Sequence, residues 1–379
     1  LRSVLRARGD KKAEGNLAHL LDFVAIGTVA DVVKLDQVNR IFISHGLRLI
    51  RSRLSHPGIK ALLKIAGRQE QDASCKDLGF VIGPRINAAG RLENISLSIE
   101  CLLSDEIKEA EYYADILNTL NEKRRQTERQ MLESAEEQIK TVDINPVIIV
   151  YSTDFHPGVV GVVAGRLKEK YYVPTLVFSQ GEEGLLRGSG RSVPGLHLRD
   201  LLAHSKEILG DKIVAFGGHA LAAGLTLQAD ALDEFREVFK KVVMAAASEN
   251  KEGKTFISDG SLLTQKVPLS LIKRLNREVW GEGFPEPWFS DVFTLLKQQP
   301  IGKKGEHSAA YLQQNGHTYK ALFFYQQPQL PSQFLLLYRP QTRIWQGKEE
   351  LQLEAIYWEE ALDPKRSVSY THLRAHETD

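Results

Sequence analysis

The sequence has few of the features that mark secreted or membrane proteins. Only two of its 379 residues are cysteine, Cys75 and Cys101. Two thiols make neither a disulfide framework nor a metal knuckle, so we expect buried or idle thiols in a reducing cytoplasm. No run of 18 or more apolar residues occurs and no signal peptide opens the printed sequence, so we expect no association with a membrane.

The net charge is also close to zero, and the sequence contains few methionines. Lysine and arginine total 49 against 48 aspartate and glutamate, a formal net charge of +1. A basic coat is thereby excluded, and any nucleic-acid surface must be a local patch. The length favours two or three domains. Because the sequence starts with Leu1 and contains only two methionines, we expect a fragment whose natural N-terminus is missing.

The first part of the chain predicts one strand and then helices. Residues 20–33, LLDFVAIGTVADVV, form a continuous apolar run, which predicts a strand buried on both faces with a turn at Gly27. Residues 40–66 read as helices broken at Pro57. Residues 104–142 contain neither glycine nor proline and predict one long helix, of the kind that bridges two domains.

The second part predicts an α/β domain and a small barrel. Strand, helix and strand signals over 147–179 form a βαβ unit, which implies a parallel or mixed sheet. Beyond residue 257, about five short alternating strands in roughly 100 residues favour a barrel of the OB-fold type. The last residues fit no element, and His372 and His376 there belong to a disordered or foreign tail rather than to a metal site.

Asp31 is a candidate metal ligand. It ends the predicted strand, and α/β sheets bind ligands at the carboxyl ends of their strands. A carboxylate there suits Mg²⁺ or Mn²⁺, which prefer hard oxygen donors. Aspartate is also a good helix N-cap, and the residue alone leaves both interpretations open.

The segment GPRINAAGR, residues 83–91, is a candidate phosphate clamp. Arg85 and Arg91 lie six residues apart, with Asn87 and small residues between them. Small residues allow a backbone to approach phosphate, and two guanidinium groups can bind its oxygens. An ordinary loop with surface arginines explains the segment equally well.

The segment RGSGRS, residues 187–192, is a second candidate anion site. It follows a predicted strand and precedes a helix, so backbone N–H groups could add to the site. Its glycines free the backbone, while Ser189, Arg191 and Ser192 supply donors. A plain glycine hairpin is the alternative.

Two histidines follow or precede glycines. FGGHALAAGL places His219 directly after Gly217 and Gly218, at the end of a predicted strand. Its imidazole could hydrogen-bond a phosphate or a leaving oxygen, although a lone histidine is more often a satisfied core residue. His156, in DFHPGVVG, precedes a glycine-rich helix start. Three anion-binding loops together favour a polyphosphate or a nucleic-acid backbone as ligand.

Taken together, the motifs resemble the RecJ family of bacterial single-stranded-DNA-specific exonucleases, which are DHH phosphoesterases. In chain order they read AIGTVADVVKLDQVNR, GFVIGPRINAAGRLEN, HPGVVGVVAGRLKEKY, GSGRSVPGLHLRDLL and FGGHALAAGL. The resemblance continues through WGEGFPEPWFSDVF (280–293) and covers the chain to about residue 360.

The resemblance implies a fold class and a domain order. The fold is α/β: a partial DHH domain at 1–103, a long connecting helix at 104–144, a DHHA1 α/β domain at 145–250, and a C-terminal OB-fold β-barrel at 255–362. The barrel would bind single-stranded DNA. Residues 366–379 would be a non-native or disordered tail.

The resemblance also implies roles for the candidate residues, all in contact with metal or substrate. They are Asp31 as a ligand of a Mn²⁺ or Mg²⁺ pair; Arg85, Asn87 and Arg91 beside the scissile phosphate; Ser189 and Arg191 on the 5′-terminal phosphate; and His219 near the substrate. Aromatic residues of the barrel could stack on bases. The candidates are Tyr311, Tyr319, Phe323, Phe324 and Tyr325, none of them singled out because alternation sends half into the core.

The implied activity is 5′→3′ release of mononucleotides from single-stranded DNA by metal-dependent hydrolysis, in repair and recombination. Single-strand-binding protein and a RecQ-type helicase are the implied partners. The family's earlier aspartate motifs and its DHH triplet are absent, so we expect this fragment to be inactive alone, since Asp31 cannot hold two ions by itself. The alternatives are a DHH-family phosphodiesterase for nanoRNA or cyclic dinucleotides, which normally lacks an OB-fold, and a non-catalytic module that binds single-stranded nucleic acid.

Overall fold

The chain forms two compact units in the computed structural model. The structure describes residues 2–9, 17–140, 146–248, 256–264, 267–302, 305–324, 326–345 and 348–361. The first unit takes its described residues from Leu1–Ser55, Arg68–Phe80 and Phe256–Asp379, and the second from His56–Gly67 and Val81–Thr255. The expected tail at 366–379, with His372 and His376, lies outside the described residues.

Helices form the N-terminal part of the first unit. They are α1 (Arg2–Ala7), the 3-10 turn η2 (Leu17–Leu20), α2 (Leu21–Ala30), α3 (Gln37–Arg51), η3 (Glu70–Asp72), α5 (Cys75–Asp77) and the π-helical turn η4 (Leu78–Ile82). The Asp36 carboxylate caps α3 by accepting from the Asn39 N–H at 2.8 Å. Helices α2 and α3 pack at Gly46, where a Cβ would lie 2.2 Å from the Leu21 carbonyl oxygen.

The prediction of a strand over 20–33 is wrong, because most of this segment is helix α2 and Gly27 lies within it. Asp22, Ala25 and Ile26 are its buried residues, a helical spacing. A short apolar run does not distinguish a buried strand from a buried helix, because a segment without polar residues shows neither the two-residue period of a strand nor the 3.6-residue period of a helix.

The second unit begins with helices that pack on α8 (Ile107–Ile139). They are α4 (Pro57–Ile65), α6 (Gly83–Leu92) and α7 (Ser96–Leu103). The predicted break at Pro57 is confirmed, and so is the long helix, whose 33 residues span about 50 Å. It begins three residues later than Ser104, because Ser104 instead ends α7 and donates its hydroxyl to the Glu100 carbonyl.

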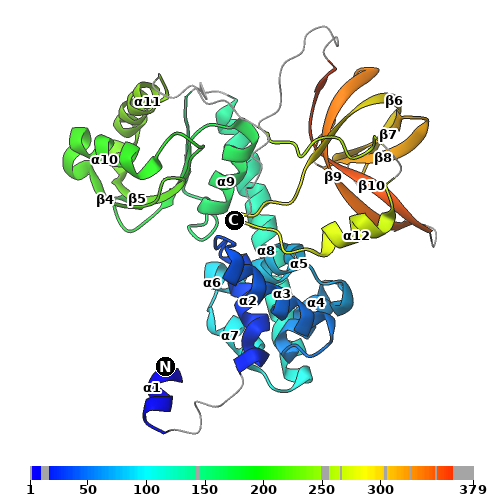
Figure 1. Ribbon diagram of the computed structural model, residues 1–379. Helices are drawn as coiled ribbons and strands as arrows, with labels where there is room; N and C mark the ends of the chain where they lie inside the picture. The colour runs from blue at the N-terminus through cyan, green and yellow to red at the C-terminus, as the bar shows by residue number, and fades with distance from the viewer. Residues whose placement is uncertain are drawn as a thin grey trace. The chain divides into compact units, whose positions relative to one another are not determined.

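A five-stranded sheet follows in the second unit (Figure 1). Its order is β1 (Ile148–Ser152), β2 (Thr175–Gln180), β3 (Leu185–Arg191), β5 (Ala222–Gln228) and β4 (Ile213–Gly218). Strands β1 and β2 run parallel and are joined by α9 (Val160–Tyr171), which confirms the βαβ unit; the other neighbours are antiparallel. Helix α9 and the end of α8 cover one face, and α10 (Leu198–Leu209) and α11 (Leu232–Ser248) cover the other.

The predicted five-stranded barrel is confirmed in the first unit (Figure 1). Helix α12 (Leu269–Arg277) precedes it. Its strands are β6 (Phe289–Ile301), β7 (His307–Gln314), β8 (His317–Phe323), β9 (Gln333–Trp345) and β10 (Lys348–Glu360), closed in the order β10-β8-β7-β6-β9. The contact of β10 with β8 is parallel, and the other pairs of strands are antiparallel.

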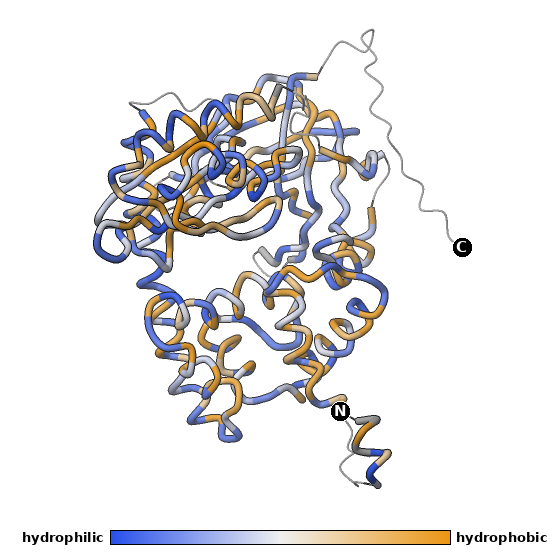
Figure 2. The backbone as a smooth tube through the Cα atoms, turned by 90° about the vertical axis from the view of Figure 1, so that its left-hand side faces the viewer, coloured by the Kyte–Doolittle hydropathy of each residue, from blue (hydrophilic) through white to orange (hydrophobic). Residues whose placement is uncertain are grey.

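The chain keeps apolar residues in mixed rather than continuous runs. Figure 2 shows apolar and polar stretches alternating along the helices. Among the described residues, no helix is both long enough and apolar enough to cross a membrane. The expectation of buried thiols is confirmed: Cys75 and Cys101 are free and buried, and burial raises the pKa of Cys101 to about 11.

A buried carboxylate holds the barrel together. The Asp291 side chain on β6 is 4% exposed and accepts hydrogen bonds from Tyr338 Oη at 2.6 Å and Gln314 Nε2 at 2.8 Å. It also accepts from the Ser261 hydroxyl and the Leu262 N–H, which fixes the segment that precedes the barrel. Burial, together with the hydrogen bond that its hydroxyl donates to Asp291, raises the pKa of Tyr338. A buried charge of this kind is stable only while its donors remain in place.

Replacing Asp291 by alanine should therefore destabilise the barrel by about 3 kcal/mol, because several buried donors lose their acceptor. Urea unfolding followed by tryptophan fluorescence would measure this, since all four tryptophans lie between residues 280 and 358. The matched control is Asp259→Asn, an exposed carboxylate that accepts from the Trp288 N–H at 3.0 Å, which should change stability by less than about 1 kcal/mol. Equal losses for the two variants would contradict the assignment.

Candidate functional site

Strand β3 carries the RGSGRS motif, most of which is strand rather than loop or hairpin. The prediction of a loop there is wrong because the glycines serve packing in the sheet. A Cβ at Gly188 would lie 2.6 Å from Phe178, and one at Gly190 would lie 2.8 Å from Leu198. The backbone N–H groups are used by the ladders to β2 and β5 and are not free for an anion.

Ser189 and Arg191 lie on the opposite face of β3, toward helix α9. Side chains alternate along a strand, so the two polar residues share a face and the two glycines share the other. A Cβ at Gly161 of α9 would lie 2.9 Å from Ser189 Oγ and 3.2 Å from Arg191 Nη2. The Arg191 guanidinium donates to Ser189 Oγ at 3.3 Å and to the Gly190 carbonyl at 2.8 Å. Gly161 therefore lets helix α9 approach a hydroxyl and a guanidinium more closely than a side chain would allow.

The GPRINAAGR motif is also regular structure, because it forms helix α6 instead of the expected loop. Asn87 and Arg91 are exposed and four residues apart, so they share one helix face. Arg91 Nη1 donates to the Gly158 carbonyl at 3.1 Å. A Cβ at Gly158 would lie 2.2 Å from the Arg91 carbonyl oxygen, so only glycine permits this approach of α6 to the turn before α9.

His156 belongs to the same turn. Its Nδ1 accepts from the Gly158 N–H at 3.1 Å, which leaves the proton of the neutral ring on Nε2. The ring is half-buried. It is thus oriented by the backbone and keeps one nitrogen for another partner.

Arg91 and Arg191 are close enough to repel each other. Burial, followed by the charge of Arg91, lowers the pKa of Arg191. A guanidinium nevertheless stays protonated in proteins, so both residues keep their positive charge. Neither forms a salt bridge with a carboxylate among the described residues. Two adjacent guanidinium groups could bind an anion through several donors, which makes this pair a candidate anion site.

A buried ion-pair network that the sequence analysis missed supports this region. Arg124 of α8 donates to Glu128 at 2.8 Å and to Asn121 at 3.1 Å, and Glu128 also accepts from Arg166 of α9 at 3.1 Å. Burial lowers the pKa of Arg124 against the opposing effect of Glu128, and the charges of Arg125 and Arg91 lower it slightly further. The network joins α8 to α9. The spacing of Arg124 and Glu128 at i and i+4 on a predicted helix was the available signal.

Two predicted site residues have their side chains inside the fold. Arg85 is 9% exposed and donates to Asn118 Oδ1 at 3.1 Å and to the Val81 carbonyl at 2.8 Å. Ser192 is 2% exposed and donates its hydroxyl to the Leu196 carbonyl at 2.7 Å. Both therefore hold the scaffold, and the structure does not bring their donors to the surface beside Arg191.

The GGH motif lies one strand away from Arg191. Strand β4 ends at Gly218 as predicted, and the small residues after it form β5. Gly218 has φ +146° and its Cβ would lie 2.4 Å from the Ala222 carbonyl oxygen, so glycine is required. The His219 N–H donates to that carbonyl at 2.8 Å, and Ala222 pairs with Arg191 across the sheet. His219 itself is exposed.

A floor of glycines extends sideways from Ser189. Ser189 pairs with Gly224 of β5, and Gly224 pairs with Gly217 of β4. A Cβ at Gly217 would meet no atom within 4 Å, and one at Gly224 would meet only the Gly188 carbonyl at 3.7 Å. The sheet face next to Ser189 is therefore open backbone, on which an extended ligand could lie.

Asp31 belongs to the first unit and ends helix α2. It follows a helix, not a strand, and it is the C-cap, so the N-cap alternative is also wrong; its N–H donates to the Gly27 carbonyl at 3.0 Å. A carboxylate at a helix C-terminus is disfavoured by the helix dipole. The next residue, Val32, has φ +55°, which β-branched residues rarely adopt. A strained backbone conformation of this kind persists only where the surrounding structure holds it in place.

Asp31 fits a divalent cation as one ligand of several. It is exposed, and carboxylate oxygen suits Mg²⁺ and Mn²⁺. Within the part of the chain that the structure describes, no group of three or more histidine, cysteine, aspartate or glutamate side chains could hold a metal ion. A two-metal centre would need further ligands from beyond these residues.

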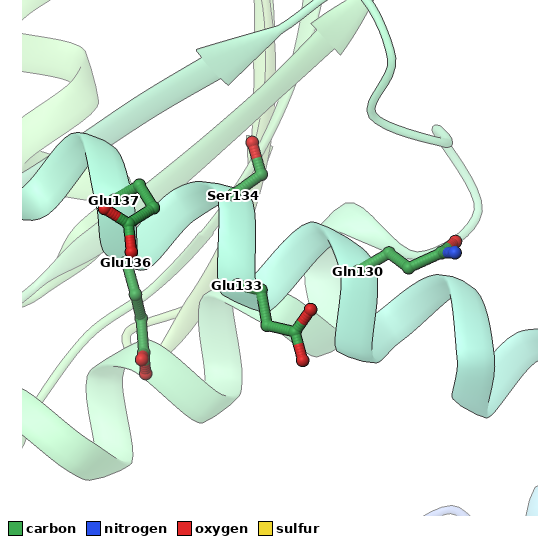
Figure 3. Close-up of a pocket in the computed structure, with 5 residues that line it drawn as sticks. All are labelled: Gln130, Glu133, Ser134, Glu136 and Glu137. Carbon is green, nitrogen blue, oxygen red and sulfur yellow. The ribbon is translucent and has the colours of Figure 1, made fainter.

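A surface hollow on α8 is lined by none of the candidate residues (Figure 3). It is lined by Gln130, Glu133, Ser134, Glu136 and Glu137. Glu136 accepts from Lys170 at 2.6 Å and Glu137 accepts from Lys140 at 2.5 Å, so three carboxylates, counting Glu133, line the hollow and would repel a phosphate chain. The hollow is therefore not an anion site.

The barrel aromatics divide between core and surface. Phe323 is buried, and Tyr319 packs edge-on against Phe293 at 6.2 Å between ring centroids. Phe324 is 44% exposed, and Lys320 Nζ lies 5.9 Å from the Tyr311 ring centroid. Tyr325 lies outside the described residues. Phe324 and Tyr311 remain the candidates for stacking.

Comparison with known proteins decides the family. A family model of the DHHA1 domain matches residues 145–245, and one of the RecJ OB domain matches residues 258–357. The single-stranded-DNA-specific exonuclease RecJ of Dickeya dadantii is 43% identical over 299 residues, which cover 77% of this chain and 52% of that protein. This chain belongs to the RecJ family.

Other RecJ proteins extend the likeness. RecJ of Haemophilus influenzae is 37% identical over 363 residues, which cover 92% of this chain and 63% of that protein. The crystal structure of RecJ in complex with Mn²⁺ from Thermus thermophilus has a TM-score of 0.77 and 26% identity, over 92% of this chain and 50% of that one. The chain thus spans about half the length of the RecJ proteins that it matches.

The fold class expected from the resemblance is confirmed: a partial DHH domain, a long helix, a DHHA1 domain and an OB-fold barrel. The boundaries assigned to these domains stay predictions.

Methyl groups placed on α9 should distinguish the open site from the rest of the helix. Gly161→Ala puts a methyl group against Ser189 and Arg191 and should weaken phosphate binding about tenfold, because both side chains must move to make room for it. Gly165→Ala is the matched control, since a Cβ there meets nothing within 4 Å. Both changes favour the helix, by up to about 1 kcal/mol. Thermal shifts in titrations with inorganic phosphate would measure the difference, and equal affinities would refute the site.

Proposed function

We propose that this chain contributes the phosphate-binding and DNA-holding parts of a 5′→3′ exonuclease, which releases mononucleotides from single-stranded DNA in repair and recombination. The observation that carries the proposal is the pair Arg91 and Arg191, of which Arg191 donates to Ser189 and neither has a carboxylate partner among the described residues. The matched RecJ proteins are named single-stranded-DNA-specific exonucleases, which supports it.

In this proposal Ser189 and Arg191 hold the 5′-terminal phosphate, and Arg91 with Asn87 holds the neighbouring phosphate. Two guanidinium groups provide enough donors for both, and binding the end of the strand fixes which phosphodiester is cleaved. The glycine floor at Gly217 and Gly224 admits the sugar–phosphate chain without a steric clash. Exposed His219 would hydrogen-bond a phosphate or the leaving oxygen. A direct role for Arg85 beside the scissile phosphate stays a prediction.

Asp31 would hold one of two divalent ions, Mn²⁺ or Mg²⁺. RecJ structures from Thermus thermophilus are described in complex with each of these ions. When bound, such a metal pair lowers the pKa of water and brackets the attacking and leaving oxygens. The exposed carboxylate of Asp31 at the end of α2 supplies one hard oxygen ligand for it.

The barrel would hold the DNA strand through Lys320, Tyr311 and Phe324, by charge and by stacking. Its presence speaks against a phosphodiesterase for nanoRNA or cyclic dinucleotides. Single-strand-binding protein and a RecQ-type helicase are the partners that the resemblance suggests, with the bacterial cytoplasm as the location; both stay predictions.

The terminal phosphate offers the sharpest test of the proposal. This chain should bind a 5′-phosphorylated oligodeoxythymidine at least about tenfold more tightly than its 5′-hydroxyl counterpart, because charge-assisted hydrogen bonds to the phosphate are added. Arg191→Gln should abolish the preference. Arg187→Gln on the same strand should preserve it, since Arg187 is paired with Glu182 at 3.1 Å. Fluorescence anisotropy at fixed salt is the measurement, and equal affinities of the unsubstituted chain for both oligonucleotides would overturn the proposal.

The metal requirement gives a second test. The 379-residue chain with Mn²⁺ should not digest single-stranded DNA, because one carboxylate cannot hold two ions. Gel analysis of a 3′-labelled oligonucleotide would show this, with the Haemophilus influenzae relative as the active control. Stepwise 5′→3′ digestion by this chain that Asp31→Asn abolishes would contradict the expectation.

A further inference from the structure

The motif WGEGFPEPWFSDVF has no part in the proposed function so far, yet its first five residues form a compact turn. In the Trp280–Phe284 turn, the N–H groups of Gly281 and Phe284 donate to each other's carbonyl, at 2.9 and 3.1 Å. The rings of Trp280 and Phe284 stack with centroids 5.2 Å apart and planes 8° apart. Trp280 Nε1 donates to the Leu275 carbonyl at 2.7 Å, which fixes the turn to the end of α12.

The turn grips the loop of residues 31–36, within the same unit. The Leu35 N–H donates to the Glu282 carbonyl at 2.7 Å. Leu35 is 5% exposed, and a Cβ at Gly281 would lie 2.8 Å from its Cδ1. Gly283 has φ +74°, and its Cβ would lie 2.8 Å from Lys34 Cγ. The two glycines therefore allow an approach that side chains would block.

A cation–π contact fixes the turn to α3 as well. The Arg40 guanidinium lies 3.6 Å from the centroid of the Phe284 ring. The loop is tied to α3 independently, because Asn39 Nδ2 donates to the Lys34 carbonyl at 2.9 Å. Turn, loop and helix α3 thus form one contact cluster, which begins within four residues of Asp31.

The strained start of the loop needs such a support. Val32 keeps φ +55° with its side chain 64% exposed, so packing of that side chain does not compensate for the strain. The start of the loop is held to α2 by two backbone hydrogen bonds, Val32 N–H to the Val29 carbonyl at 3.2 Å and Val33 N–H to the Thr28 carbonyl at 3.0 Å. Downstream, the Leu35 N–H donates to the Glu282 carbonyl and ties the loop to the turn. Release of this downstream contact would leave the strained residues after Asp31 without their tie to the turn.

We propose that the Trp280–Phe284 turn is a positioning clamp for Asp31, through which the segment leading into the barrel fixes the metal-binding carboxylate. Gly281, Gly283 and Phe284 are positioning residues that act on the loop after Asp31 through Leu35, Lys34 and Arg40, respectively. The metal role of Asp31 rests on the proposed function, but the clamp itself is a property of the chain without metal.

Amide hydrogen exchange in the 31–36 loop tests the clamp without metal or DNA. Phe284→Leu removes the stacked ring and the cation–π partner, and should speed exchange at Val33 and Leu35 about tenfold. Phe284→Tyr retains the aromatic face and should restore slow exchange. Tyr357→Leu is the matched control, because it removes another stacked pair of the same unit, Phe256–Tyr357 at 4.8 Å, away from the loop.

Arg40→Gln provides a second variant should Phe284→Leu fail to fold, with Arg40→Lys as its conservative partner. Faster exchange confined to the loop in the leucine or glutamine variant, with normal exchange in the barrel strands, supports the clamp. Unchanged loop exchange, or an equal increase across α3 and the barrel, overturns it. Failure of the proposed function would instead appear as a missing 5′-phosphate preference in the unsubstituted chain, which exchange in this loop does not report.

Discussion

The repulsion between Arg91 and Arg191 is the constraint that shapes the candidate site. Each guanidinium is held in place by a backbone carbonyl, of Gly158 and Gly190 respectively, although the other's charge opposes the arrangement. Such a pair gains its full stability only when an anion lies between the charges. The Arg124–Glu128 pair of α8 also binds Arg166 of α9, which fixes these two helices to each other.

Glycines make this arrangement feasible, in two opposite ways. Gly188 and Gly190 face the core side of β3, where the side chains of Phe178 and Leu198 occupy the space that a Cβ would need. Gly158 and Gly161 instead keep α6 and α9 close to the arginines without covering them. Glycines thus allow close packing on both faces of the strand, against core side chains on one face and against the arginines on the other. A spacing of glycines in the sequence does not reveal which of the two a given glycine does.

The sequence analysis succeeded where periodicity carries the information. Alternation predicted the barrel strands, and the absence of glycine and proline predicted α8. It failed at residues 20–33 and in the two arginine motifs, because apolar or glycine-rich segments have no polar period to distinguish helix, strand and loop. The motifs supplied the right residue types, but Arg85 and Ser192 face carbonyls inside the fold, and only tertiary contacts decide that.

Asp31, in the other unit, also depends on tertiary contacts for its conformation. Its carboxylate stands at the unfavourable end of a helix, before a valine in a left-handed conformation, so the isolated segment would not hold this geometry. The turn that leads into the barrel supplies the missing constraint through Leu35. The barrel, the turn and the 31–36 loop belong to one compact unit. If the barrel binds DNA and Asp31 binds metal, as proposed, one body carries both groups, which fixes the distance between them better than a flexible tether would.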